Sequence, residues 1–196
     1  MGPVVARPLA LPAAAGAAES LRRGLAEESA HVRIAAIEAA VSATAIEALP
    51  VLEDFDLKRD PEVAPTAIHA TAILGASADD RTRDRAARTL AAWLRAETKR
   101  DGVDALGNVP NIVEALGDIG GPDAVKALTA ALDSKSLPLQ VETLATQKLG
   151  ELADRNARGA VERFASRIAA LPQGEGLDEE LRVEAIDAAR TTLARL

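Results

Sequence analysis

A short apolar pattern recurs along the chain and constrains its fold more than any other feature. In V-R-I-A-A-I-E-A-A, residues 32–40, the apolar Val32, Ala36 and Ala39 are spaced by four and three positions, so they share one face of a helix. The same frame fits segments that begin at Val63, Asn108, Val141 and Leu181. A second apolar-periodic helix is expected before each of the five copies. Such repetition predicts helix pairs that bury their apolar faces only against neighbouring pairs.

The composition and the positions of the helix breakers support this interpretation. Hydrophobic residues make up 48% of the chain but aromatic residues only 2%, so the apolar content is mainly Ala, Leu, Val and Ile. Alanine is the best helix former. Turn signals fall between the expected helices, at Asp60-Pro61, Asp101-Gly102 and Gly120-Gly121-Pro122. Pro65 and Pro110 are tolerated only in a first turn, so their helices are expected to start near Ala64 and Val109.

Three segments carry a resemblance to a known family. They are L-A-E-E-S-A-H-V-R-I-A-A-I-E-A-A (residues 25–40), A-L-G-D-I-G (115–120) and K-L-G-E-L (148–152). In these segments the chain resembles the HEAT-repeat family, including its bacterial lyase-like branch. The resemblance implies an all-α fold, an α-solenoid or superhelix of about five HEAT-like antiparallel helix pairs over residues 19–196. Residues 1–18, rich in Ala and Pro, are then expected to form a flexible N-terminal tail.

One departure from the family concerns charge. HEAT repeats often carry an Arg just after the Val, paired with an acidic residue in the preceding turn. Only two of the five copies keep it, since the position holds Arg33, Ala64, Val109, Glu142 and Arg182. We therefore expect any ladder of Asp–Arg bonds to be broken.

The core is expected to contain Leu25, Val32, Ala36, Val63, Ala67, Trp93, Leu116, Val141, Ala145 and Leu149.

The residues offer little catalytic chemistry. The chain has no Cys, which excludes disulfides and thiolate metal sites, and its only histidines, His31 and His69, occupy unrelated positions of the repeat. Asp54, Asp56 and Asp60 crowd one stretch but lack the Gly and Glu of a calcium loop, and Asp60 is expected to cap the next helix. We therefore predict no catalytic residues, no metal site and no cofactor. The net charge of -7 also disfavours a general nucleic-acid surface.

A basic stripe is the most distinctive surface feature. It consists of Arg81, Arg85, Arg88, Arg95 and Lys99, whose spacing places them on one face of a helix. One interpretation is the solvated face of an amphipathic helix on the outer, convex side of the solenoid. The other is a docking strip for an acidic partner.

The sequence thus predicts a non-enzymatic scaffold or adaptor that binds a protein or peptide partner. The second helices should form the concave row, where Arg33, Glu38, Glu114, Glu142 and Arg182 point outward and mix their charges. The alternatives are a lyase-like or chaperone-like helper acting on a partner protein, and a weak nucleic-acid binder through the Arg81–Lys99 stripe. With no apolar run long enough to span a membrane, a cytoplasmic location is expected, or an extracytoplasmic one if the N-terminus is a trimmed signal remnant.

Overall fold

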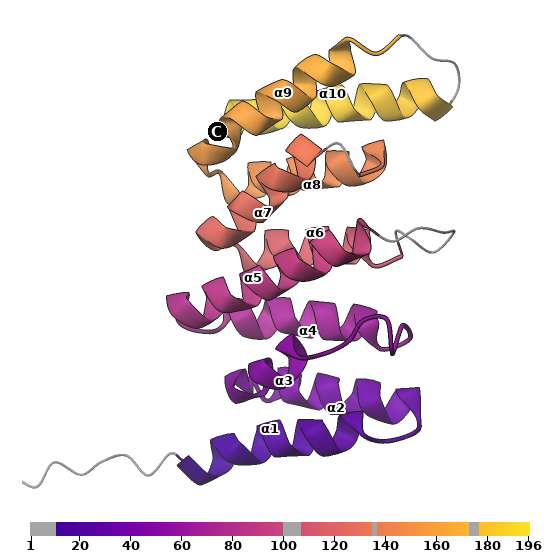
Figure 1. Ribbon diagram of the computed structural model, residues 1–196. Helices are drawn as coiled ribbons and strands as arrows, with labels where there is room; N and C mark the ends of the chain where they lie inside the picture. The colour runs from indigo at the N-terminus through magenta and orange to yellow at the C-terminus, as the bar shows by residue number, and fades with distance from the viewer. Residues whose placement is uncertain (1–10, 100–106, 135–136, 173–176) are drawn as a thin grey trace, which may run out of the picture.

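The chain folds into helices alone wherever its structure is described. The computed structural model describes residues 11–99, 107–134, 137–172 and 177–196 (Figure 1). Within these ranges there are ten α-helices, two short 3-10 helices and no strand. The all-α class predicted from the apolar periodicity is confirmed.

The ten helices follow one another as five pairs. The pairs are α1 (Leu11–Leu25) with α2 (Ala30–Ser42), α3 (Leu49–Glu53) with α4 (Ala64–Ala76), α5 (Asp80–Glu97) with α6 (Val109–Ile119), α7 (Gly121–Ser134) with α8 (Leu139–Leu152), and α9 (Arg158–Ala169) with α10 (Leu177–Arg195). The 3-10 helices η1 (Ile46–Ala48) and η2 (Arg155–Ala157) lead into α3 and α9. The helix starts predicted at Ala64 and Val109 are both confirmed, with Pro65 and Pro110 in the first turns.

The pairs are arranged so that the helices form two rows. The second helices α2, α4, α6, α8 and α10 contact one another in that order, and we call them the second-helix row. The first helices α1, α3, α5, α7 and α9 do the same and form the first-helix row. Figure 1 shows the chain rising pair by pair from α1 at one end of the stack to α10 at the other.

The predicted boundary of the N-terminal tail needs a correction. Helix α1 begins at Leu11, so residues 11–18 are helical, and only residues 1–10 lie outside the described part. The physical reason is local: Pro12 suits the first turn of a helix, and the alanines that follow are strong helix formers.

Most of the predicted core is buried where expected. The side chains of Val63, Ala67, Leu116, Ala145 and Leu149 are fully buried, and Val141 is nearly so. Leu25, Ala36 and Trp93 are partly buried and pack against this core. Most of the apolar positions of the pattern are therefore buried or partly buried, as predicted.

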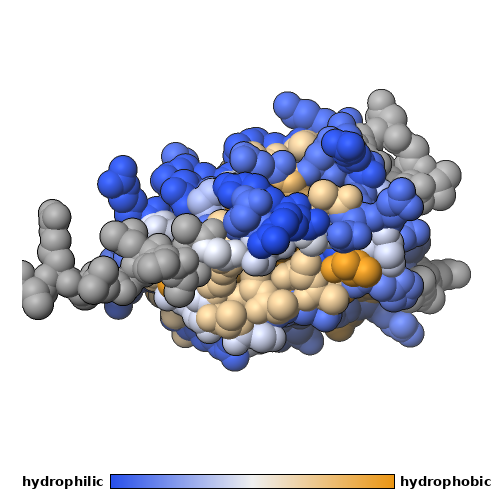
Figure 2. All heavy atoms as spheres, turned by 90° about the horizontal axis from the view of Figure 1, so that it is seen from below, coloured by the Kyte–Doolittle hydropathy of each residue, from blue (hydrophilic) through white to orange (hydrophobic). Residues whose placement is uncertain are grey.

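The expected burial of Val32 is wrong, because its side chain is 46% exposed. Helix α2 ends the second-helix row, so the face that α4 or α8 buries against a neighbour has no neighbour there. Figure 2 looks at this end of the stack and shows an apolar band across it, bordered by hydrophilic residues. Val32, Ala35 and Ala39 lie on this exposed face of α2. A repeat position thus predicts burial only where a neighbouring unit covers it.

Glycines set the spacing within the second-helix row. A Cβ added to Gly75 of α4 would lie 2.5 Å from Cδ1 of Ile119 in α6. One added to Gly150 of α8 would lie 2.6 Å from Oγ1 of Thr192 in α10, and one added to Gly117 of α6 would overlap the side chain of Lys148 in α8. Three successive contacts of the second-helix row therefore depend on the missing side chain of a glycine.

Candidate binding grooves

Two arginines that were predicted to face a partner are held in intramolecular ion pairs. Arg33 donates from Nε and Nη2 to the carboxylate of Asp60, in the next unit, and from Nη1 to the carbonyl oxygens of Glu27 and Glu28. The hydrogen bond to Asp60 raises the pKa of Arg33 above its ordinary value. Asp60 consequently does not cap α4, which has no side-chain cap. Arg182 makes two hydrogen bonds to Glu179 within α10, and these likewise raise its pKa.

The expectation that Glu142 faces outward is also wrong. Its side chain is only 2% exposed, and one carboxylate oxygen accepts a hydrogen bond of 2.7 Å from Nη2 of Arg167 in α9. Glu142 lies in the first turn of α8, where α9 of the next unit covers it with Arg167. Its charge therefore joins two units instead of facing a partner.

Further ion pairs between units come from positions outside the expected ladder. Arg85 pairs with Glu53 at 2.9 Å, Arg88 with Asp123 at 2.6 Å, and Arg163 with Asp133 at 2.8 Å, each joining two successive first helices. In the second-helix row, Nζ of Lys148 lies 3.0 Å from Asp118. Burial lowers the pKa of Lys148, but its hydrogen bonds to Asp118 and Glu151 outweigh this and leave the pKa raised. Arg–carboxylate and Lys–carboxylate pairs thus connect the units even though the expected ladder is incomplete.

The second-helix row keeps two of the predicted site residues exposed, Glu38 and Glu114. Helices α6, α8 and α10 each carry more acidic than basic residues, whereas α1, α5 and α9 of the first-helix row carry more basic ones. Of the five residues expected to mix their charges on this face, Arg33, Glu142 and Arg182 are engaged in ion pairs, and the exposed Glu38 and Glu114 are both acidic.

A groove of about 560 Å³ separates α2 from α4 on this row. Its apolar lining comes from Val41, Pro65, Ala70 and Ile73, and its polar lining from Glu38, Ser42, Thr66 and His69. Glu38 and His69 are both exposed, and neither takes part in an ion pair or side-chain hydrogen bond within the described residues. This groove therefore combines apolar walls with polar groups that are available to a ligand.

The basic stripe divides into two parts. Arg85 and Arg88 are paired with Glu53 and Asp123, as above. Arg81, Arg95 and Lys99 are exposed and have no ion-pair partner in the described part of the chain. The stripe lies in the first-helix row, as expected, and two of its five members join α5 to its neighbours.

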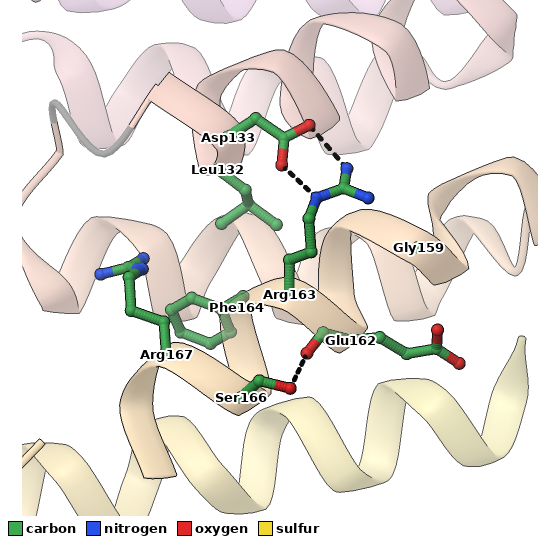
Figure 3. A pocket seen from close by; sticks show the side chains of 8 residues that line it. All are labelled: Leu132, Asp133, Gly159, Glu162, Arg163, Phe164, Ser166 and Arg167. Carbon is green, nitrogen blue, oxygen red and sulfur yellow. Dashed lines mark hydrogen bonds and ion pairs between the residues drawn. The ribbon is translucent and has the colours of Figure 1, made fainter. Parts of the chain in front are cut away.

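A second groove, between α7 and α9, is shown in Figure 3. It has a volume of about 620 Å³. Arg163 reaches across it to Asp133 through two hydrogen bonds of 3.0 and 2.8 Å, which raise the pKa of Arg163 (Figure 3). Arg167 lies 5.4 Å from the ring centroid of Phe164 and pairs with Glu142. Both cations are already neutralised, so an anionic ligand would have to displace a carboxylate of the chain.

A third groove runs between α5 and α7, also in the first-helix row. It has a volume of about 330 Å³ and is lined mainly by alanines and Leu94, with Arg95, Thr98, Lys99 and Ser134 beside them. Its two cations, Arg95 and Lys99, are two of the three exposed members of the basic stripe that have no ion-pair partner among the described residues. Periodicity placed Arg95 correctly on α5, but Lys99 lies just after the helix ends. It gave no indication of the groove, because the groove also needs the alanines of α7.

Neither metal-binding nor membrane-spanning features occur in the described ranges. No group of three or more His, Asp or Glu side chains is placed to hold a metal ion there. The acidic stretch at 54–60 is used by the fold, since Asp56 accepts the backbone N–H of Lys58 and Asp60 binds Arg33. No described helix is both long and apolar enough to cross a bilayer.

Comparison with known proteins gives no assignment: the sequence matches no protein-family model, and no curated protein is significantly similar to it.

Proposed function

We propose that the chain is an α-solenoid of HEAT-like helix pairs that acts as a non-enzymatic scaffold for a protein or peptide partner, with the second-helix row as its inner surface. Two features support this architecture. Each pair packs mainly on the pairs before and after it. Glycines allow close contacts between the second helices from α4 to α10, while two grooves lie between first helices from α5 to α9, and a stack with one more closely packed row curves toward that row.

The single observation that carries the binding role is the groove between α2 and α4. Val41 and Ile73 offer it apolar walls, and Glu38 and His69 offer polar groups that have no ion-pair or side-chain hydrogen-bond partner among the described residues. Apolar walls with a few available polar groups are typical of sites that fix the orientation of a ligand. Glu38 and the acidic surplus of the row favour a partner segment with an apolar side chain beside a Lys or Arg.

The same charge pattern disfavours a polyanion on this face, because phosphate groups would meet acidic side chains. The lyase-like and chaperone-like alternatives involve a partner protein as well, and they differ from a scaffold in what happens after binding. A docking experiment on the α2–α4 groove therefore tests the part that these proposals share.

The test uses a photo-crosslinking amino acid placed at Thr66, which lines the groove, in the full chain expressed in its native cells. We expect one discrete protein adduct, and we expect Glu38→Lys to reduce its yield by removing the acidic group. The matched control places the same crosslinker at Ala169, an exposed position on α9. Absence of an adduct at Thr66, or the same adducts from both positions, would refute the proposal.

A further inference from the structure

The groove between α5 and α7 lies on the first-helix row, apart from the α2–α4 groove of the proposed function. Small side chains line it: Ala91 and Ala131 are nearly buried in its floor, and Ala127 and Ala130 are more accessible. Leu94 adds one large apolar group. The hydroxyls of Thr98 and Ser134 donate to the backbone carbonyls of Arg95 and Ala131 in their own helices. The lining is thus apolar in character, and small side chains leave room for larger ones from outside.

Two uncommitted cations flank this apolar lining. Arg95 lies in the last turn of α5, Lys99 lies two positions after the last residue of that helix, and both line the groove. Both are exposed, and neither has an ion-pair partner among the described residues. The neighbouring groove between α7 and α9 differs, since its Arg163 is paired with Asp133 (Figure 3) and its Arg167 with Glu142. In a chain with a net charge of -7, the α5–α7 groove therefore keeps two positive charges beside an apolar surface.

We propose that the α5–α7 groove binds an acidic amphipathic helix of a partner protein. Leu, Ile or Met side chains of that helix fill the alanine-lined space, and Asp or Glu side chains one turn away pair with Arg95 and Lys99. This is the helix-in-groove mode of recognition, in which an apolar face provides affinity and flanking charges fix the register. The site shares no residue with the α2–α4 groove, so a negative result for one groove does not refute the proposal for the other.

Charge complementarity favours this occupant over a nucleic acid. A polyanion would use the whole basic stripe, but Arg85 and Arg88 are already paired with Glu53 and Asp123. An alanine-lined floor also offers nothing to a phosphate backbone. An amphipathic helix uses both the apolar floor and the two free cations.

The experiment measures fluorescence anisotropy of the full chain with a labelled helical probe of about five turns. The probe is built from Leu, Ala and Glu, with Leu along one face, and a matched probe carries Lys in place of Glu. At low ionic strength, where charge attraction is least screened, the Glu probe should bind and the Lys probe should not. Arg95→Glu and Lys99→Glu should each weaken binding by about tenfold. Filling the groove with Ala127→Met should weaken it without any change of charge.

The matched control is Arg81→Glu, which makes the same charge change at an exposed, unpaired position of the same helix away from the groove. It should bind the Glu probe like the parent, and circular dichroism should show that all variants keep the parent helix content. The proposal is overturned if the Glu probe gives no anisotropy change. Equal weakening by Arg81→Glu and Arg95→Glu would also overturn it, as would binding unaffected by Ala127→Met or stronger binding of duplex DNA at the same residues.

Discussion

From α4 to α10, neighbouring helices of the second-helix row meet at glycines, whereas from α3 to α9 the helices of the first-helix row are joined by ion pairs. Gly75, Gly117 and Gly150 each let the next second helix approach closely. In the first-helix row, successive contacts from α3 to α9 are instead bridged by Arg85–Glu53, Arg88–Asp123 and Arg163–Asp133. Close packing tolerates little change in volume, while exposed ion pairs contribute little to stability. The second-helix row should therefore be the more sensitive to substitution.

The largest effect is expected from Ala145→Leu in α8. Ala145 is fully buried in the second-helix row, so three added carbon atoms must displace packed neighbours. We expect the free energy of unfolding to fall by about 3 kcal/mol, the upper end of the usual cost of overpacking. Chemical denaturation of the parent and the variant measures this change in the free energy of unfolding. The control is Ala130→Leu in α7, an exposed position beside the α5–α7 groove, which should be tolerated. Similar losses from both substitutions would show that the two rows do not differ.

A smaller loss is expected from Gly150→Ala. Alanine favours helix over glycine by up to about 1 kcal/mol, but here its Cβ would lie 3.2 Å from Cα of Thr192 as well as close to the hydroxyl. Because backbone cannot move aside as a flexible side chain can, we expect a net destabilisation of about 2 kcal/mol.

The matched control for this change is Gly159→Ala in α9. There the added Cβ would lie 3.3 Å from Nη1 of Arg163, the far end of a long, exposed side chain. A melting temperature equal to or above that of the parent is expected. If Gly150→Ala is also neutral, the second helices are not held together at glycines.

The first-helix row should respond weakly to loss of an ion pair. Arg88→Ala removes the bridge from α5 to Asp123 at the start of α7, and the Arg88 side chain is largely exposed. Exposed pairs contribute about 0–1 kcal/mol, and salt screens them. We expect a loss of about 0.5 kcal/mol at low salt that disappears at high salt. A loss as large as that of Gly150→Ala would contradict the proposed difference between the rows.

The sequence predicts the helix pairs better than it predicts their surfaces. Apolar spacing identified the buried face of α8, and Pro65 and Pro110 marked the starts of two helices, because both signals act within one helix. The predicted burial of Val32 was wrong because its exposure depends on whether another unit covers α2. The predicted exposure of Glu142 was wrong for the converse reason, since Arg167 of a later helix covers it.

The grooves could not be predicted because each needs side chains from two helices far apart in the sequence. Glu38 and His69 lie at equivalent positions of successive units, six residues after Val32 and Val63, but this spacing alone does not show that they line the same groove. The repeated Leu-Gly at 74–75, 116–117 and 149–150 was a usable signal for the close contacts of the second-helix row. A glycine recurring inside a helical pattern often marks a close approach.

The smallest expected difference between the rows is in how their helix caps respond to a fall in pH. Helix α5 of the first-helix row is capped by Asp79, whose carboxylate accepts the backbone N–H of Thr82 at 2.8 Å. Helices α4 and α6 of the second-helix row have no side-chain cap and carry Pro65 and Pro110 in their first turns, which do not titrate. The hydrogen bond from the Thr82 N–H lowers the pKa of Asp79 below its ordinary value of 3.8. Because the folded-state pKa is the lower one, the cap stabilises the fold fully above about pH 3.8 and loses its effect as the pH falls through the folded-state pKa.

Asp79→Asn keeps an acceptor for Thr82 but cannot titrate. Between about pH 6 and about pH 3 the parent should therefore lose more stability to urea than Asp79→Asn does. Equal losses in the two proteins would show that this cap does not contribute to acid sensitivity.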